Sequence, residues 1–94
     1  MRITFFYSAK ENAIIAAMGD ELKPGVIATA MDGTEKAGRL GDGADPMAII
    51  DDVIAQFRAN PASVGMYFIL KGGRVNEKDA SHFTKMASAD LSEA

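Results

Sequence analysis

Cysteine and tryptophan are absent from this chain of 94 residues, and histidine occurs once. Without cysteine the protein can form no disulfide, offers no thiolate nucleophile and cannot bind zinc or an iron–sulfur cluster through sulfur. The absence of thiols fits the reducing cytoplasm, which is the location we expect. No motif has the ligand spacing of a metal or nucleotide site, so we expect neither a metal ion nor a cofactor.

An excess of positive charge is also lacking. Lysine and arginine together number 10, and aspartate and glutamate number 13, which gives a formal net charge of −3. Domains dedicated to nucleic acids normally concentrate basic residues in a patch that displaces counterions from phosphates. The charge balance therefore disfavours a nucleic-acid partner and excludes no protein partner.

Long hydrophobic runs are missing as well. The longest apolar run in the C-terminal half, Met66–Leu70, is far below the ~20 residues that span a bilayer. Residues 1–12 lack the apolar segment of a secretory signal, because Ser8, Lys10 and Glu11 interrupt them. We expect a protein that is neither exported by this route nor inserted into a membrane.

The sequence does contain enough apolar residues for one core. Hydrophobic residues make up 48% of the chain and charged residues 24%, as in a globular domain and unlike a disordered tail. Domains usually take roughly 100–200 residues, so there is no room for two. We expect residues 1–94 to form a single domain that folds by itself.

The N-terminal segment predicts a strand followed directly by a helix. Arg2–Ser8 is rich in β-branched and aromatic residues, as in a buried strand. Ser8 and Glu11 have the spacing of a helix capping box, and apolar residues then recur at helical spacing as far as Leu22. Proline and glycine within Lys23–Gly25 end that helix.

Two strands are expected next. Val26–Met31 is apolar and β-branched, and the dipeptide Asp32–Gly33 is typical of a tight hairpin turn. Thr34–Leu40 then forms a short return strand. Its polar composition suits the edge of a sheet and not the centre.

The clearest start of a helix comes at Asp45, an N-cap residue that is followed by proline at the first helical position. Its expected buried face consists of Met47, Ile50, Val53, Ile54 and Phe57. After Asn60 and Pro61 break the helix, the nearly continuous apolar run Val64–Leu70 predicts a strand covered on both faces. A last helix is expected from about Asn76, with one side formed by Ala80, Phe83, Ala87 and Leu91.

The resulting order, β-α-β-(β)-α-β-α, fits two folds. We favour a small three-layer α/β domain whose sheet is mostly parallel, with the polar strand at one edge. The alternative is a ferredoxin-like α+β fold. It would place the polar strand in the centre of the sheet, which the residue pattern opposes.

Two glycine-containing loops are candidates for anion binding. Gly41–Pro46 precedes a helix, but its aspartates repel an anion and its proline removes a donor, so we interpret it as a hinge and cap. The loop after Leu70 carries glycines and cations. In the parallel fold it would lie beside the end of the first strand, where open α/β sheets bind ligands. The predicted site consists of Ser8, Lys10, Lys71, Gly72, Gly73 and Arg74.

No catalytic arrangement is recognisable. His82 has Asp79 three residues before it, but no positioned nucleophile accompanies the pair. We therefore expect no enzymatic activity. The predicted function is that of a protein-binding module, an adaptor or inhibitor such as small mobile elements encode, acting through a protein surface or by forming a homodimer.

The sheet edge formed by Val64–Leu70 would be one surface for such binding, through strand pairing. The alternative function is a small-ligand binder that recognises a phosphate or nucleotide at the loop site described above.

Overall fold

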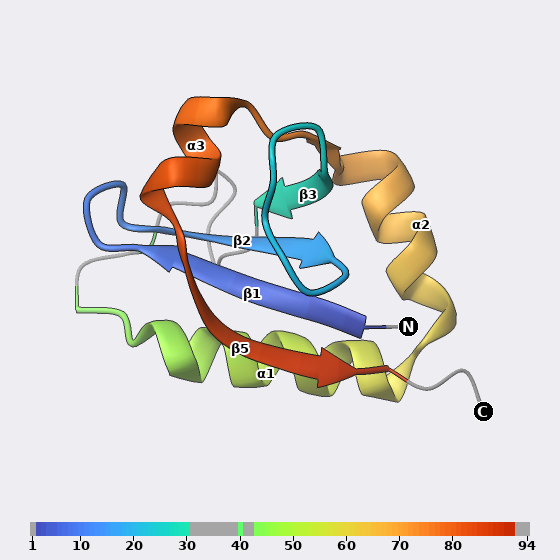
Figure 1. Ribbon diagram of the computed structural model, residues 1–94. Helices are drawn as coiled ribbons and strands as arrows, with labels where there is room; N and C mark the ends of the chain where they lie inside the picture. Colours follow the sequence, from blue (N-terminus) through green and yellow to red (C-terminus); the bar gives the residue numbers. More distant parts are fainter. Residues whose placement is uncertain (1, 31–39, 41–42, 92–94) are drawn as a thin grey trace.

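The computed structural model describes residues 2–30, 40 and 43–91. In this part of the chain five strands form one sheet in the order β4-β3-β2-β1-β5, and all neighbouring strands are antiparallel (Figure 1). The strands are β1 (Arg2–Ser8), β2 (Ala13–Met18), β3 (Ile27–Ala30), β4 (Gly73–Arg74) and β5 (Thr84–Asp90). The helices are α1 (Pro46–Ala59), α2 (Ala62–Lys71) and α3 (Glu77–His82).

The prediction of a mostly parallel three-layer α/β sheet is therefore wrong. Parallel neighbours need a long crossover between them, whereas β1 leads into β2 through residues 9–12 alone. The observed antiparallel arrangement is closer to the α+β alternative. It still differs from the ferredoxin-like order, because no helix separates the first two strands.

The helix expected between Ser8 and Leu22 is also wrong, although its first hydrogen bond forms. The Ser8 hydroxyl accepts from the backbone N–H of Glu11 at 3.1 Å, as a helix cap would. Asn12 then adopts a left-handed conformation with φ of 50°, and the chain reverses. The following residues pair with β1 on one side and β3 on the other, and these contacts outweigh the helical spacing.

Asn12 also connects this turn to the segment before α1. Its side-chain amide donates to the Leu40 carbonyl at 3.1 Å, and the Leu40 N–H donates to the Asn12 carbonyl at 2.8 Å. Leu40 is buried in the core. The predicted turn at Asp32–Gly33 and the rest of the strand Thr34–Leu40 lie outside the described residues, whereas β3 confirms a strand within Val26–Met31.

Helix α1 begins where the sequence predicts. The Asp45 carboxylate accepts a hydrogen bond from the Met47 N–H at 3.1 Å, with Pro46 at the start of the helix. Ile50 and Phe57 are buried, whereas Met47 at the first turn remains exposed. The cap interpretation of this loop is therefore confirmed at Asp45.

Replacing Asp45 by alanine tests the cap. The Met47 N–H would lose its acceptor, and we expect a loss of about 1 kcal/mol in the free energy of unfolding. Urea unfolding followed by far-UV circular dichroism measures this loss. An Asp45→Ser variant, which keeps a capping oxygen, should retain most of the stability; equal losses in both variants would contradict the assignment.

Helix α2 replaces the strand expected at Val64–Leu70. Short apolar runs fit either a buried strand or a buried helix, and composition alone does not separate them. Here Val64 and Phe68, four residues apart, point into the core, which is the spacing of one helical face. The predicted side-by-side pairing of this segment with β1 is absent, and so is the exposed strand edge that it would have offered.

The last predicted helix is correct only at its start. Helix α3 ends at His82, and β5 then pairs with β1. Ala87, Ala89 and Leu91 alternate with polar residues and pack toward the core, a period of two that is typical of a half-buried strand. A register irregularity opposite Phe5 and Phe6 makes β5 a less regular edge for pairing with another chain.

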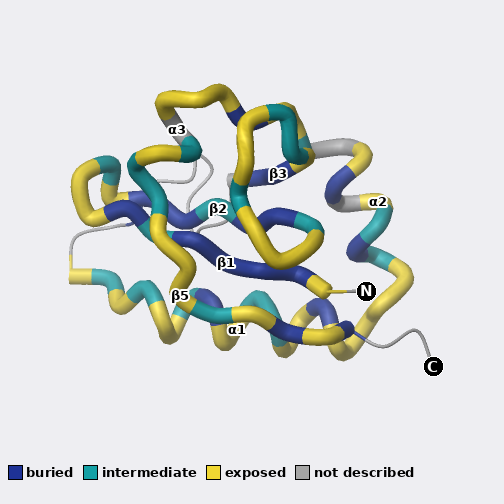
Figure 2. The backbone as a smooth tube through the Cα atoms, viewed as in Figure 1, coloured by how far each residue is buried: buried dark blue, intermediate teal, exposed yellow. Residues whose placement is uncertain are grey.

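Both faces of the sheet are covered, which explains why β1 is buried along almost its whole length (Figure 2). On one face Ile3, Phe5 and Ile14 pack with residues of α1 and α2. On the other, Phe6 packs with Val75 and with residues of the β2–β3 connection and the α3 region. None of the helices in the described ranges is both long and apolar enough to cross a membrane.

Candidate functional site

A groove opens on the sheet face that α1 and α2 cover, where α2 packs beside β3. Arg74 of β4 is directly opposite Ile27 of β3. Met18 follows Ala17, which is opposite Ala28, so the three residues Met18, Ile27 and Arg74 form one row across the sheet. Residues opposite one another share a face, and this row forms the floor of the groove.

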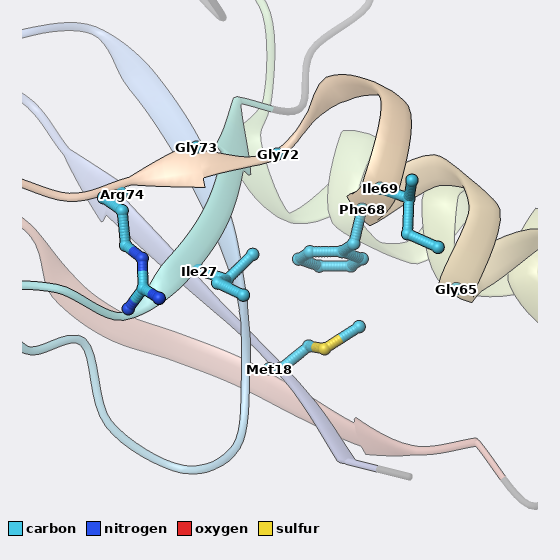
Figure 3. Close-up of a pocket in the computed structure, with 8 residues that line it drawn as sticks. All are labelled: Met18, Ile27, Gly65, Phe68, Ile69, Gly72, Gly73 and Arg74. Carbon is cyan, nitrogen blue, oxygen red and sulfur yellow. The ribbon is translucent and has the colours of Figure 1, made fainter.

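Helix α2 forms the wall. The groove has a volume of about 540 Å³ and is lined by Met18, Ile27, Gly65, Phe68, Ile69, Gly72, Gly73 and Arg74. Figure 3 shows the ring of Phe68 directed toward Ile27 with Met18 nearby, while Gly65 and Arg74 lie at opposite ends. The volume falls in the range of ligand and peptide sites, and the lining is almost entirely apolar.

The outer side of α2 extends this apolar surface. Ile69 is 77% exposed and Met66 is 56% exposed, and Ile27 across the groove is 44% exposed. Single exposed apolar residues are ordinary, but several beside one apolar groove form a patch. This patch and the groove are continuous, since Ile27 and Ile69 also line the groove.

Among the described residues that line the groove, Arg74 is the only charged one. Its guanidinium donates a hydrogen bond to the backbone carbonyl of Gly25, which holds the side chain in place. A guanidinium has five N–H donors, so others remain available. Within residues 2–30, 40 and 43–91, no carboxylate forms an ion pair with Arg74.

Lys23, two residues before Gly25 in the sequence, does have a carboxylate partner. Its ammonium group lies 2.9 Å from the Glu21 carboxylate. The side-chain hydrogen bond from Lys23, and then its charge, lower the pKa of Glu21, and the same pair raises the pKa of Lys23. Because both side chains are exposed, the pair adds little stability. Among the described residues, Lys23 has a carboxylate partner and Arg74 has none.

The six residues predicted to bind an anion are not brought together. Gly72, Gly73 and Arg74 line the groove, and Lys71 is the last residue of α2. Ser8 and Lys10 lie at the β1–β2 turn. The side chain of Lys71 is not described. Of the predicted residues that the structure describes in full, Gly72, Gly73 and Arg74 belong to the candidate site.

The strand register shows how far apart the two groups are. Gly73 of β4 is opposite Ala28 of β3, which is opposite Ala17 of β2, which in turn is opposite Thr4 of β1. Ser8 is four residues beyond Thr4, about 13 Å along the strand, and β1 is three strands from β4, about 14 Å across. The parallel topology that would have joined the two groups is absent.

The single histidine contacts the β1–β2 turn. His82 Nδ1 lies 3.4 Å from Glu11 Oε1, but it is buried and makes no hydrogen bond. In the part of the chain that the structure describes, no three histidine or carboxylate side chains are placed to hold a metal ion. This contact joins α3 to the hairpin.

The sequence pattern does not point to five of the lining residues, which are Met18, Ile27, Gly65, Phe68 and Ile69. Its helical spacing places Met18 in a helix, and its apolar run places the three residues of α2 in a buried strand. The pattern that could have revealed the wall lies in α2: Ala62, Met66 and Ile69 are exposed, at helical spacing, in a segment without a charge before Lys71.

Comparison of the chain with protein-family models, with curated proteins and with solved structures found no match. The fold and the groove define a small antiparallel α+β domain with one apolar, arginine-ended surface.

Proposed function

We propose that this protein is a protein-binding module that holds a segment of another protein in the groove between α2 and the β3–β4 edge. The segment presents apolar side chains to the groove and a carboxylate to Arg74. The observation that carries the proposal is the combination of an apolar, exposed surface with one arginine that has no carboxylate partner among the described residues. A buried arginine–carboxylate contact gives such an interface its direction.

A second copy of this chain fits the groove less well. In a two-fold dimer the same patch faces itself, and none of the described residues that line the groove is acidic. Arg74 would then meet no carboxylate from the opposite groove. The net charge of −3 also makes two copies repel one another weakly.

The small-ligand alternative retains one supporting observation, because Arg74 can donate to any anion. A phosphate or nucleotide, however, would find a single cation and apolar walls, whereas phosphate sites usually converge several donors. As a binder the protein would act as an adaptor or an inhibitor without chemistry of its own.

Selection from a displayed library of short random peptides tests the proposal. Peptides that bind the full chain should combine large apolar residues with aspartate or glutamate. Ile69→Asp should weaken their binding by about tenfold or more, because it places a charge on the contact surface. Its melting temperature should change little, since Ile69 is exposed.

The matched control is Ala55→Asp, on the exposed side of α1 and away from the groove. It should leave binding unchanged. If no peptide is selected, or if Ile69→Asp binds as well as the unaltered protein, the proposal is wrong. A melting temperature raised by nucleotides or phosphorylated metabolites, and lost in Arg74→Ala, would instead support the small-ligand alternative.

A further inference from the structure

We infer that the bound segment is an α-helix whose backbone approaches α2 closely at Gly65 and whose carboxylate, about two turns away, reaches Arg74. This inference rests on the proposed function. It adds the conformation, direction and sequence pattern of the partner.

Gly65 is the first observation. It lies inside α2, where glycine costs stability relative to alanine because it loses more backbone freedom on folding. A packing requirement inside the molecule could justify that cost. A Cβ built on Gly65 meets nothing within 4 Å, however, so none of the described neighbours needs the space.

The space at Gly65 opens into the groove. Gly65 lines it together with Phe68 and Ile69, which lie three and four residues further along α2. Figure 3 shows Gly65 at the end of the groove opposite Arg74. A missing side chain on a helix surface lets a second backbone come closer than the usual 8–10 Å between helix axes.

A helix fits the groove better than an extended strand. A bound strand needs a long sheet edge with free backbone groups, and the edge next to the groove is β4, which has two residues. The groove wall, in contrast, is a helix with exposed apolar side chains. Apolar grooves of this kind bind amphipathic helices, whose own apolar residues at positions i, i+3, i+4 and i+7 enter the groove.

The length of the groove sets the position of the carboxylate. Gly65 and Gly72 are seven residues apart on α2 and its cap, about 10 Å along the helix axis, and Arg74 lies beyond them. A partner helix lying along α2 covers this distance in about two turns. Its apolar residues then meet Ile69 and Phe68, and an aspartate or glutamate at the far end meets the guanidinium.

The experiment uses the peptides selected on the full chain and two variants of Gly65. Gly65→Ala should raise the melting temperature by about 2–8 °C. It should nevertheless weaken peptide binding about threefold, because the added methyl group keeps the partner's backbone from packing closely against α2. Gly65→Leu should weaken binding at least about tenfold. The control Ala55→Leu, on the exposed side of α1, should leave binding unchanged.

Two further measurements concern the partner. Bound peptide should show helical carbon chemical shifts, and proline at its centre should abolish binding. Arg74→Gln and replacement of the peptide's acidic residue by its amide should each weaken binding about tenfold, with little further loss when combined, as for two groups that contact one another.

The outcomes separate the two proposals. Two results would overturn the helix inference and leave the groove as a protein-binding site. In the first, the peptides lose affinity for the Ile69→Asp variant but are extended when bound. In the second, they bind the Gly65→Leu variant as well as the unaltered protein. Failure to select any peptide would overturn both. A higher melting temperature for Gly65→Ala together with weaker binding is the result that a purely structural role for Gly65 does not produce.

Discussion

Phe5→Ala is expected to lower the free energy of unfolding by about 3–5 kcal/mol, the range for removal of a buried aromatic ring. Phe5 has no exposed surface. Its partners on either side in the sheet are both alanines, Ala16 on β2 and Ala87 on β5. Because alanines cannot move to fill the space left by the ring, we expect the loss to fall at the upper end of the range.

Urea unfolding monitored by far-UV circular dichroism gives the value. The matched control is Met66→Ala, which also truncates a large apolar residue, but at a position that is 56% exposed. It should cost less than about 1 kcal/mol. Comparable losses in the two variants would mean that the core does not lie between the sheet and α1.

Gly72→Ala is expected to cost about 1–3 kcal/mol, the usual penalty for an extra carbon in closely packed structure. The backbone at Gly72, with φ of −74° and ψ of 156°, suits any residue, so the cost is steric. A Cβ there would overlap the backbone carbonyl oxygen of Phe68 and lie 3.3 Å from a methyl group of Ile27. The Phe68 carbonyl also accepts the Gly72 N–H at 2.9 Å, so the last turn of α2 would have to move.

Gly73→Ala provides the comparison for this variant. A Cβ at Gly73 meets nothing within 4 Å, and the residue is exposed, so its unfolding midpoint in urea should stay close to that of the unaltered protein. Equal midpoints for Gly72→Ala and Gly73→Ala would contradict the close contact between α2 and Gly72. Since Phe68 and Ile27 line the groove, Gly72→Ala should also weaken peptide binding.

Helix α2 serves both the core and the groove. Val64 and Phe68 face inward, whereas Met66 and Ile69 remain exposed. A helix that is apolar on all sides is normally buried on all sides. Met66 and Ile69 are the most exposed of the large apolar residues that the structure describes, and this side of α2 is where the proposed partner would bind.

Strong local preferences made some elements predictable. The Asp45–Pro46 pair determined the start of α1, because an N-cap and a proline act on backbone groups within one turn. The buried strand β1 and the strand within Val26–Met31 followed from β-branched and aromatic residues. The sequence placed Gly72, Gly73 and Arg74 in a predicted anion site, and these three residues also line the groove, whereas it did not point to Gly65 or to the other lining residues.

The amino-acid sequence by itself determined the absence of cysteine chemistry, the cap of α1 and the first strand. Tertiary structure alone decided that Ala13–Met18 is a strand and that Val64–Leu70 lies within a helix. Both runs are short and apolar and suit either conformation, so distant residues made the choice: β1 and β3 on either side of β2, and the sheet face beneath α2. The groove depends on both decisions, because Met18 forms its floor and α2 forms its wall.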